Sequence, residues 1–534
     1  MKGVFELSGL TVGYLYDRCT TYYKDEIAIK YYDRAYTYGQ VKQQAFSLSN
    51  ALYQKGLKKG EKIAFLMKNC PEYIICEYAL AINGNVRVPL AVLLGNNDHV
   101  YMMNQAECTT LIYHEKMAQR VKEMLPELKT VKHFVCVSDH PVQLKTEQLI
   151  DGHEHLQSMI KNHESVSRPV ETDPEDLCGI YFTGGTTGLP KGVMLSHRAW
   201  VETVFLELLE TGIEAREKFA YMTPLTHAGG CYILPVFLRK GTCVIMDQFS
   251  PKDFLETVQR EQVTCTLVVP TMLYMLLDDP DFEKYDLSSL RNILYGAAAI
   301  APERLKQAVD TFGPILTQFF GQTEAPMMIS VLSRDDHIIE DPEKQKRVYA
   351  SCGRPTMRTK VSIVGEDGTE VKTGEVGEVT AFCPNVMHGY LKNPEATAET
   401  LKDGWLYTGD LGKQDQEGFI YLVDRTKDMI VSGGFNIFPR EVEDALFEHE
   451  TVKNAAVVGV PHEKWGEAVK AIVVLNEGRT TTEDELVEFV KKSKGKLVAP
   501  KSVEFWDAIP VTNLGKVDKK KIREKYWAGK DRRI

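Results

Sequence analysis

The segment YFTGGTTGLPKGVMLSH, at positions 181–197, combines residue types that suit the binding of phosphate groups. Its glycines leave backbone N–H groups open to a ligand, its threonines carry hydroxyls, and Lys191 adds a positive charge. The spacing does not match the G-x-x-x-x-G-K-S/T loop of P-loop NTPases, because Pro190 precedes this lysine and Gly192 follows it. The segment therefore predicts a phosphate site of another kind, with a Gly/Thr-rich surface turn as the alternative.

Two acidic residues further along the chain suit other parts of a nucleotide. Glu324 follows Thr323 in FFGQTEA, and a carboxylate beside a polyphosphate is a natural ligand for Mg²⁺. Asp410, in YTGDLG, lies in a glycine-flanked turn where a carboxylate can accept hydrogen bonds from two ribose hydroxyls. Taken alone, such a glutamate is more often a surface acid, and Asp410 is a plain turn aspartate.

Two basic segments complete the set of candidate residues. The segment DRTKDMIVSGGFNIFPREVE contains Arg425, Lys427 and the pair Gly433-Gly434 ahead of a helix start. The segment PVTNLGKVD places Lys516 directly after a glycine near the C-terminus. We treat these five segments as one candidate nucleotide site.

The first half of the chain alternates predicted helices and strands, which would position such a site. Thr37 and Gln40 are spaced as a capping box and begin a helix that ends at Gly56. Residues 62–67 read as a short buried strand, and residues 71–84 as a helix with proline at its start and glycine at its end. This rhythm predicts an α/β fold of layered, mostly parallel sheets with helices on both faces.

The predicted pattern of helices and strands changes twice further along the chain. Short strands separated by Gly-rich turns over residues 361–422 predict a small antiparallel or barrel-like part. Beyond it, Pro439 and a Thr482/Glu485 capping box begin helices around two strand-like segments, a compact α+β unit of about a hundred residues. We therefore divide the chain into an N-terminal domain, 1–426 (layered α/β over 1–175 and 176–345, barrel-like over 346–424), and a C-terminal domain, 427–534.

Bulk composition narrows the class of protein. A chain of 534 residues exceeds the roughly 250–300 that one core supports, so several domains are expected. A net charge of −10 argues against nucleic acid as the main partner, and no stretch approaches the ~18 apolar residues of a membrane span. The N-terminus lacks a signal-peptide core, and the 11 cysteines show no metal-binding spacing. We expect a cytoplasmic protein with reduced thiols and no zinc site, acting alone or as a homodimer.

Taken together, these motifs resemble the adenylate-forming (AMP-binding) superfamily: acyl-CoA synthetases, luciferases and the adenylation domains that load carrier proteins. The resemblance runs from YTYGQ near Tyr36 to Lys516, with the motifs in the family's order. It implies that a substrate carboxylate attacks the α-phosphate of ATP, giving an acyl adenylate and pyrophosphate. A thiol then displaces AMP. Adenylation is needed because a carboxylate alone is a poor electrophile.

The resemblance also implies roles for individual residues. Lys516 would bridge the substrate carboxylate and the α-phosphate, Thr323 would bond that phosphate, and Glu324 would hold Mg²⁺. Asp410 and Arg425 would fix the ribose. The residues implied to hold the β- and γ-phosphates are Thr183, Gly184, Gly185, Thr186, Thr187, Gly188 and Lys191. Those implied to lie by the adenine and the acyl pocket are Gly296, Ala297, Ala298 and Phe320.

A rotation of the C-terminal domain is a further implication of the family. Lys427 occupies its hinge position, and the rotation would withdraw Lys516 and bring Gly433 and Gly434 over a tunnel for the thiol. A tight turn before a helix explains those two glycines equally well.

Three residues depart from the family pattern. Gly185 replaces a serine of the phosphate loop, which removes one hydroxyl contact and puts ATP affinity in doubt. Phe320 stands where tyrosine is usual, and Phe435 stands where many members have glutamate. The GFN sequence around Phe435 is similar to fatty acyl-CoA synthetases.

The segment TPLTHAGGCYILPVF matches the acyl-pocket region and contains His227, Gly229, Gly230 and Cys231. It contains no acidic residue, which argues against an amino-acid substrate because a buried ammonium needs a counter-charge. His227 is either a gate between the half-reactions or a core residue.

The acceptor thiol is more consistent with coenzyme A than with a carrier protein, because the chain has no G-x-D-S carrier motif and HEKWGEAVKAIVV resembles acyl-CoA synthetases. Trp465 would then contact CoA, with a core position as the alternative. We therefore expect an ATP- and Mg²⁺-dependent carboxylic acid:CoA ligase for an apolar medium- or long-chain, or aromatic, acid. An acyl-AMP ligase for a carrier protein and a non-catalytic nucleotide-binding regulatory protein remain open.

Overall fold

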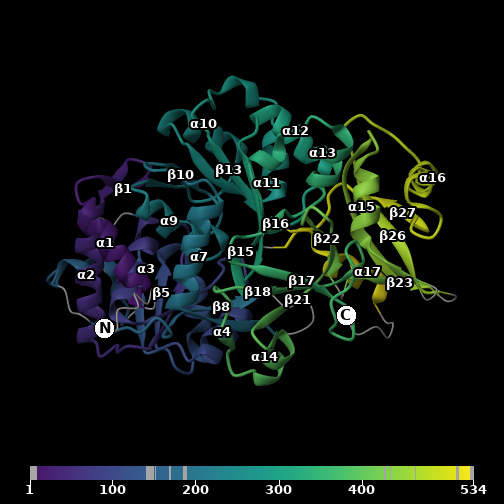
Figure 1. The fold of residues 1–534 in the computed structure, drawn as a ribbon. Coiled ribbons are helices and arrows are strands. Elements are labelled where there is room, and N and C mark those ends of the chain that lie inside the picture. Colours follow the sequence, from purple (N-terminus) through teal and green to yellow (C-terminus); the bar gives the residue numbers. More distant parts are fainter. Residues whose placement is uncertain are drawn as a thin grey trace, which may run out of the picture.

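The computed structural model describes residues 9–139, 150, 152–166, 170–183, 189–425, 428–432, 435–462, 465–512 and 516–528. Two large, mostly parallel sheets dominate the N-terminal part (Figure 1). Sheet A has nine strands in the order β16-β15-β14-β13-β12-β10-β11-β1-β2. Its strands are β1 (Ile27–Tyr31), β2 (Arg34–Thr37), β10 (Lys218–Tyr221), β11 (Thr242–Ile245), β12 (Cys265–Val268), β13 (Asn292–Gly296), β14 (Leu316–Gln322), β15 (Ala325–Leu332) and β16 (Arg354–Pro355).

Sheet B has eight strands in the order β19-β9-β8-β4-β3-β5-β6-β7. Only its edge pairs β8/β9 and β9/β19 are antiparallel among the described pairings. Its strands are β3 (Lys62–Leu66), β4 (Val86–Pro89), β5 (Thr110–His114), β6 (His133–Val137), β7 (Glu154–His155), β8 (Leu177–Thr183), β9 (Lys191–Ser196) and β19 (Gly389–Tyr390).

Helices fill the space between the sheets and cover their outer faces. The main helices of the N-terminal part are α1 (Val12–Tyr22), α2 (Tyr38–Gln54), α3 (Pro71–Asn83), α4 (Asn96–Ala106), α5 (Ala118–Met124), α6 (Leu156–Lys161), α7 (His197–Glu210), α8 (Ala228–Cys231), α9 (Ile233–Leu238), α10 (Pro251–Glu261), α11 (Pro270–Leu277), α12 (Pro302–Phe312) and α13 (Pro342–Tyr349). The predicted capping box of Thr37 and Gln40 is present at the start of α2. The predicted helix over 71–84 is α3, whose C-cap Gly84 has a φ of 67°, the left-handed conformation that glycine adopts freely.

Side-chain alternation along the strands explains the layers. Ile63 and Phe65 of β3 belong to one large core together with side chains of β10 and of α1, α2, α3, α7 and α9. Ala64 and Leu66 point the other way, into a core with α4 and α5. Since alternate residues of a strand face opposite sides, β3 is buried on both faces and reads as a continuous apolar run. The predicted α/β fold class is confirmed.

A third sheet, C, is antiparallel and follows the first two in the chain. It comprises β17 (Lys360–Val364), β18 (Gly377–Phe382), β20 (Leu401–Lys402), β21 (Trp405–Gln414) and β22 (Ile420–Arg425), with α14 (Pro394–Thr400) beside it. This is the small antiparallel part predicted from residues 361–422. The predicted division at residue 175 does not follow the sheets, because β1 and β2 join sheet A and β8 and β9 join sheet B.

The C-terminal part has its own sheet and core. Its strands and helices are β23 (Ile430–Ser432), β24 (Phe435–Ile437), α15 (Pro439–Phe447), β25 (Val452–His462), β26 (Gly466–Leu475), α16 (Glu483–Lys494), β27 (Ser502–Phe505) and α17 (Lys519–Trp527). The predicted capping box of Thr482 and Glu485 begins α16. Figure 1 shows this unit at the right, against α12, α13 and β22. Arg440 of α15 donates to the carbonyl of Ile300, and Lys346 of α13 pairs with Glu448 at 2.7 Å.

No helix in the described part of the chain combines the length and apolar character that a bilayer span requires. All 11 cysteines, Cys19 to Cys383, are free and buried. Their packing as small apolar side chains is therefore their structural role.

Candidate functional site

His227 and Lys516 approach each other although they belong to different domains. His227 is the N-cap residue of α8 and is half-buried. Burial, followed by the positive charge of Lys516, lowers the pKa of His227 to about 4. A charge shifts a pKa in this way only at short range, so the C-terminal lysine lies by the loop that carries His227. The backbone of Lys516 is bonded to that of Thr512, because the Thr512 N–H donates to the Lys516 carbonyl at 2.6 Å.

Glu324 is held by a residue that the sequence analysis did not identify. Thr323 and Glu324 form the turn between β14 and β15, and both are half-buried. The Tyr390 hydroxyl donates to Glu324 Oε1 at 2.6 Å. The ring of Tyr390 lies under Lys191, whose Nζ is 4.3 Å from the ring centroid. Tyr390 thus connects the predicted Mg²⁺ ligand to the predicted phosphate-binding lysine.

Strand pairing explains how Tyr390 reaches this position. It lies in β19, which pairs with β9 so that Tyr390 is opposite Val193. Among the described residues, the Tyr390 bond is the one hydrogen bond to the Glu324 carboxylate, which leaves Oε2 for another ligand. Mg²⁺ is held in phosphate sites by one or two carboxylates plus phosphate oxygens, so a single half-buried glutamate fits the predicted ion.

Asp410 and Arg425 lie opposite each other in adjacent antiparallel strands, β21 and β22. Asp410 is only 6% exposed. Gln322 Nε2 donates to Asp410 Oδ2 and to the carbonyl of Thr408, both at 2.7 Å. Gln322 therefore links the β14 end, where Thr323 follows, to the predicted ribose site. Two motifs far apart in the sequence are thereby brought together.

The segment Gly296-Ala297-Ala298 begins with the last residue of β13, which is tightly packed against β14. A Cβ on Gly296 would lie 2.4 Å from the carbonyl oxygen of Phe319, so only glycine fits. Ala297 has a φ of 65°, which costs free energy in a residue with a side chain. Phe320 is half-buried and packs against the cores between β15 and sheet C. Its predicted stacking on a base stays a prediction.

Gly229 and Gly230 have a packing explanation. A Cβ on Gly230 would lie 2.1 Å from the carbonyl oxygen of Leu225, and one on Gly229 would lie 2.7 Å from that of Thr223. The two glycines allow α8 to fold back on the loop before it. Cys231 is buried behind them, and burial raises the pKa of its thiol well above the ordinary value. That these residues line an acyl pocket stays a prediction.

Asn69 holds the loop that carries His227, and the sequence analysis missed it. Its amide nitrogen donates to the carbonyls of Thr223 at 3.0 Å and Met246 at 3.1 Å. Its amide oxygen accepts from the N–H of Leu225 at 2.9 Å. Asn69 is 5% exposed, so these backbone groups have no access to bulk water. One side chain from sheet B therefore fixes the end of β10 in sheet A.

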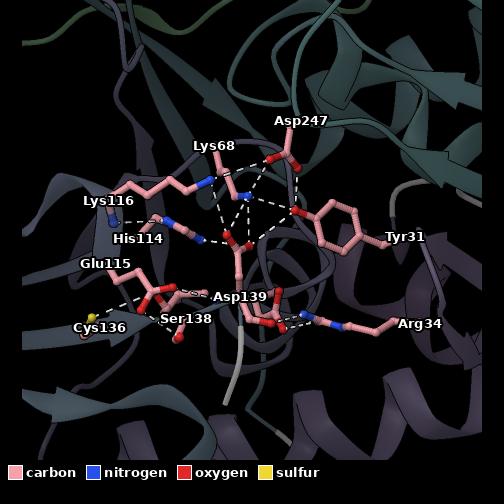
Figure 2. A network of polar contacts seen from close by, with 12 residues as sticks. Tyr31, Arg34, Lys68, His114, Glu115, Lys116, Cys136, Ser138, Asp139 and Asp247 are labelled. Atoms are coloured by element: carbon pink, nitrogen blue, oxygen red, sulfur yellow. Dashed lines mark hydrogen bonds and ion pairs between the residues drawn. The ribbon is translucent and has the colours of Figure 1, made fainter. Parts of the chain in front are cut away.

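The neighbouring residue, Lys68, strengthens the same connection. Figure 2 shows its ammonium group between Asp139 and Asp247, with ion-pair distances of 2.8 and 2.6 Å, and beside the Tyr31 hydroxyl at 2.8 Å. Although burial opposes it, the hydrogen bond from Lys68 keeps the pKa of Asp139 below its usual value. These groups follow the carboxyl ends of strands of both sheets, so Lys68 and Asn69 together clamp sheet A to sheet B.

Figure 2 also shows His114 and Glu115 beside Asp139, a geometry that metal ions use. The His114 Nε2 to Asp139 Oδ1 distance is 3.2 Å, and Glu115 binds the Ser138 hydroxyl at 2.8 Å. Because Lys68 already neutralises Asp139, we interpret this cluster as a structural ion network.

Trp465 lies at the surface of the C-terminal domain and is half-buried. Its ring stacks on His462 with centroids 4.2 Å apart, and Lys501 Nζ lies 5.5 Å from its centroid. It is therefore not a core residue, which was the alternative. Of the phosphate segment, Thr183 ends β8 opposite Lys191 of β9. The residues predicted for the site that lie outside the described residues are Gly184, Gly185, Thr186, Thr187, Gly188, Lys427, Gly433 and Gly434.

The two layered sheets carry the candidate site, and the C-terminal unit brings Lys516 to it. This arrangement defines an enzyme of the adenylate-forming class. The sequence matches the AMP-binding enzyme family over residues 16–391 and the AMP-binding enzyme C-terminal domain over residues 441–516. The chain belongs to this family, and the resemblance inferred from its motifs is confirmed.

Individual relatives are similar along nearly the whole chain. A medium/long-chain-fatty-acid–CoA ligase of Mycobacterium tuberculosis is 38% identical over 516 residues, covering 94% of this chain and 88% of the relative. A feruloyl-CoA synthase of an Amycolatopsis species is 34% identical over 504 residues, covering 93% and 96%. The solved structure of the amide bond synthetase McbA from Marinactinospora thermotolerans aligns with a TM-score of 0.86 and 30% identity, covering 96% of this chain and 99% of that one.

Proposed function

We propose that this chain is an AMP-forming carboxylic acid:CoA ligase that activates a medium- or long-chain fatty acid or an aromatic acid. The observation that carries the proposal is the approach of Lys516 to the His227 loop, because it supplies a mobile cation to a site with phosphate-binding residues. The similarity to a fatty-acid–CoA ligase and to a feruloyl-CoA synthase supports CoA as the acceptor and these two kinds of acid.

The chain's own residues address the main barrier of the first step. The substrate carboxylate and the α-phosphate are both anionic, so their approach is repulsive, and Lys516 would lie between them. Preorganised donors of this kind contribute about 10²–10³ in rate each. His227 stays neutral near pH 7 because its pKa is about 4. It therefore does not compete with Lys516 for either anion, and it can turn aside for the second step without moving a charge.

The remaining residues would bind and orient the nucleotide. Glu324, oriented by Tyr390, would hold Mg²⁺, which would neutralise charge on the phosphates when bound. Lys191 with the loop from Thr183 would hold the β- and γ-phosphates, and Thr323 the α-phosphate. Asp410, oriented by Gln322, would accept hydrogen bonds from the ribose together with Arg425 as a donor. Gly296 to Ala298 and Phe320 would lie by the adenine.

The C-terminal domain, 427–534, would rotate about Lys427 for thioester formation. Gly433 and Gly434 would then lie over the thiol tunnel, and Trp465 would contact CoA through its exposed ring edge. The stack of Trp465 on His462, with Lys501 nearby, offers an aromatic and cationic surface for a nucleotide.

Pyrophosphate release tests the proposal in two stages. With ATP, Mg²⁺ and a panel of fatty and aromatic acids but no CoA, a single burst of pyrophosphate is expected, because the adenylate stays bound. Addition of CoA should give steady turnover and an equal amount of acyl-CoA. A burst that CoA leaves unchanged would reject the acceptor, and turnover on adding a phosphopantetheinylated carrier protein or an amine would identify another one. Absence of any acid-dependent burst would reject the enzyme function.

A further inference from the structure

Glu207 is a buried acid without a visible purpose in the fold. It lies in α7 and is 0% exposed. Neither of its carboxyl oxygens has a hydrogen-bond partner among the described residues. Burial raises the pKa of Glu207 well above the usual value, which favours the neutral carboxylic acid over the carboxylate. Buried polar groups are almost always hydrogen-bonded, and an exception requires an explanation.

A second polar group without a partner lies close to it. The hydroxyl of Tyr232 is buried with no hydrogen-bond partner among the described residues, and the side chain is 0% exposed. Helix α7 packs against α9, whose N-cap residue is Tyr232, and Cys231 directly precedes Tyr232 in the chain. The three side chains therefore share one region, and an ionised Glu207 would raise the pKa values of both Cys231 and Tyr232.

This region lies at the inner end of the segment predicted to line the acyl pocket. His227 precedes α8, on the side where the charge of Lys516 acts, whereas Cys231 is the last residue of α8 and Tyr232 follows it. Four helical residues span about 6 Å, the length of a small substrate group. Helix α7 packs against α9 and β15, which brings Glu207 to this inner end.

We propose that Glu207 and Tyr232 form the polar end of the acyl pocket, and that the acid substrate carries a hydroxyl group at the end distant from its carboxylate. This inference rests on the proposed ligase function. A neutral carboxylic acid has one donor and an acceptor oxygen, which match a hydroxyl that both donates and accepts. A wholly apolar acid leaves both protein groups unpartnered. The absence of an acid in positions 223–237 argued against an amino-acid substrate, but α7 supplies an acidic residue from another part of the chain.

Matched acids with and without the distal hydroxyl test the inference. The pairs are benzoate and para-hydroxybenzoate, phenylpropanoate and its para-hydroxyphenyl analogue, and decanoate and omega-hydroxydecanoate, each assayed for kcat/KM by acyl-CoA formation. In at least one pair the hydroxylated acid should be preferred by roughly tenfold or more, since sites built to bond a hydroxyl reject the analogue lacking it. Glu207→Leu should remove most of this preference, because kcat/KM should fall more for the hydroxylated acid than for the parent acid. Glu207→Gln, which keeps a donor and an acceptor, should retain it.

Three results would overturn the inference: preference for the parent acid in every pair, preference for an amino over a hydroxyl analogue, or an equal loss on both members of a pair in Glu207→Leu. If Glu207→Leu does not fold, Tyr232→Phe replaces it, with the same selective loss expected for the hydroxylated acid. An enzyme that forms acyl-CoA from no acid refutes the ligase function itself. An active enzyme without hydroxyl preference refutes only the polar pocket end.

Discussion

The bond between Tyr390 and Glu324 gives the sharpest test of the nucleotide site. Tyr390→Phe removes the 2.6 Å hydrogen bond to Glu324 Oε1 and keeps the ring beneath Lys191. A hydrogen bond to a charged group contributes about 1.5–3 kcal/mol net, which corresponds to a factor of about 10–150. If that bond orients the carboxylate toward Mg²⁺, kcat/KM for Mg·ATP should fall by about this factor.

The assay is pyrophosphate release at varied Mg·ATP with a saturating acid. Tyr390→Leu should be worse, because loss of the contact between the ring and Lys191 adds about 0.5–2 kcal/mol. Tyr421→Phe is the matched control, since the Tyr421 hydroxyl bonds Asp415 at 2.7 Å away from the site, and its activity should be unchanged. The reasoning is refuted if Tyr390→Phe folds normally and keeps kcat/KM within about twofold of wild type, well inside the expected loss.

The remaining predictions concern the lysine, the clamp and pH. Lys516→Ala should lower adenylation by about 10²–10³ and spare thioester formation from synthetic acyl-AMP; equal loss in both assays would contradict its role. Asn69→Ala leaves two buried carbonyls unpaired, so it should lower the free energy of unfolding by about 2–4 kcal/mol in chemical denaturation and should also lower activity. Asn104→Ala, at the surface, is the control and should have little effect on either. Burial lowers the pKa to about 4 for four histidines: His99, His197, His227 and His337. The free energy of unfolding should therefore be highest above about pH 6.5 and fall towards pH 4, by up to about 3 kcal/mol per histidine. A melting temperature that does not fall over this range would contradict the last prediction.

Local signals in the sequence predicted the local structure well. Both capping boxes and the helix over residues 71–84 are in place, because their signals depend on neighbouring residues alone. The family resemblance implied that Asp410 and Arg425 act on the same ribose, and the strand register places the two residues opposite each other. The sequence analysis did not predict that β1 belongs to sheet A and β8 to sheet B, because the residues of a strand do not indicate which sheet it joins.

The residues that the sequence analysis missed share one property: their partners are distant in the chain. Tyr390 reaches Glu324 only through the pairing of β19 with β9, and Asn69 reaches the carbonyls of β10 and β11 only because two sheets meet. A tyrosine before a leucine or an asparagine before a cysteine carries no spacing signal. Nothing in the sequence distinguishes Glu207 from other charged residues of a helix, whereas its burial without a partner among the described residues does.

The burial of every cysteine has a chemical consequence for an enzyme that makes a reactive acyl adenylate and transfers its acyl group to a thiol. The nucleophile in such a transfer is the thiolate, and burial raises the pKa of all 11 thiols. Even Cys231, one turn of helix from His227, is kept protonated. The protein is thereby protected from acylating itself, and the acyl group is left for the incoming acceptor.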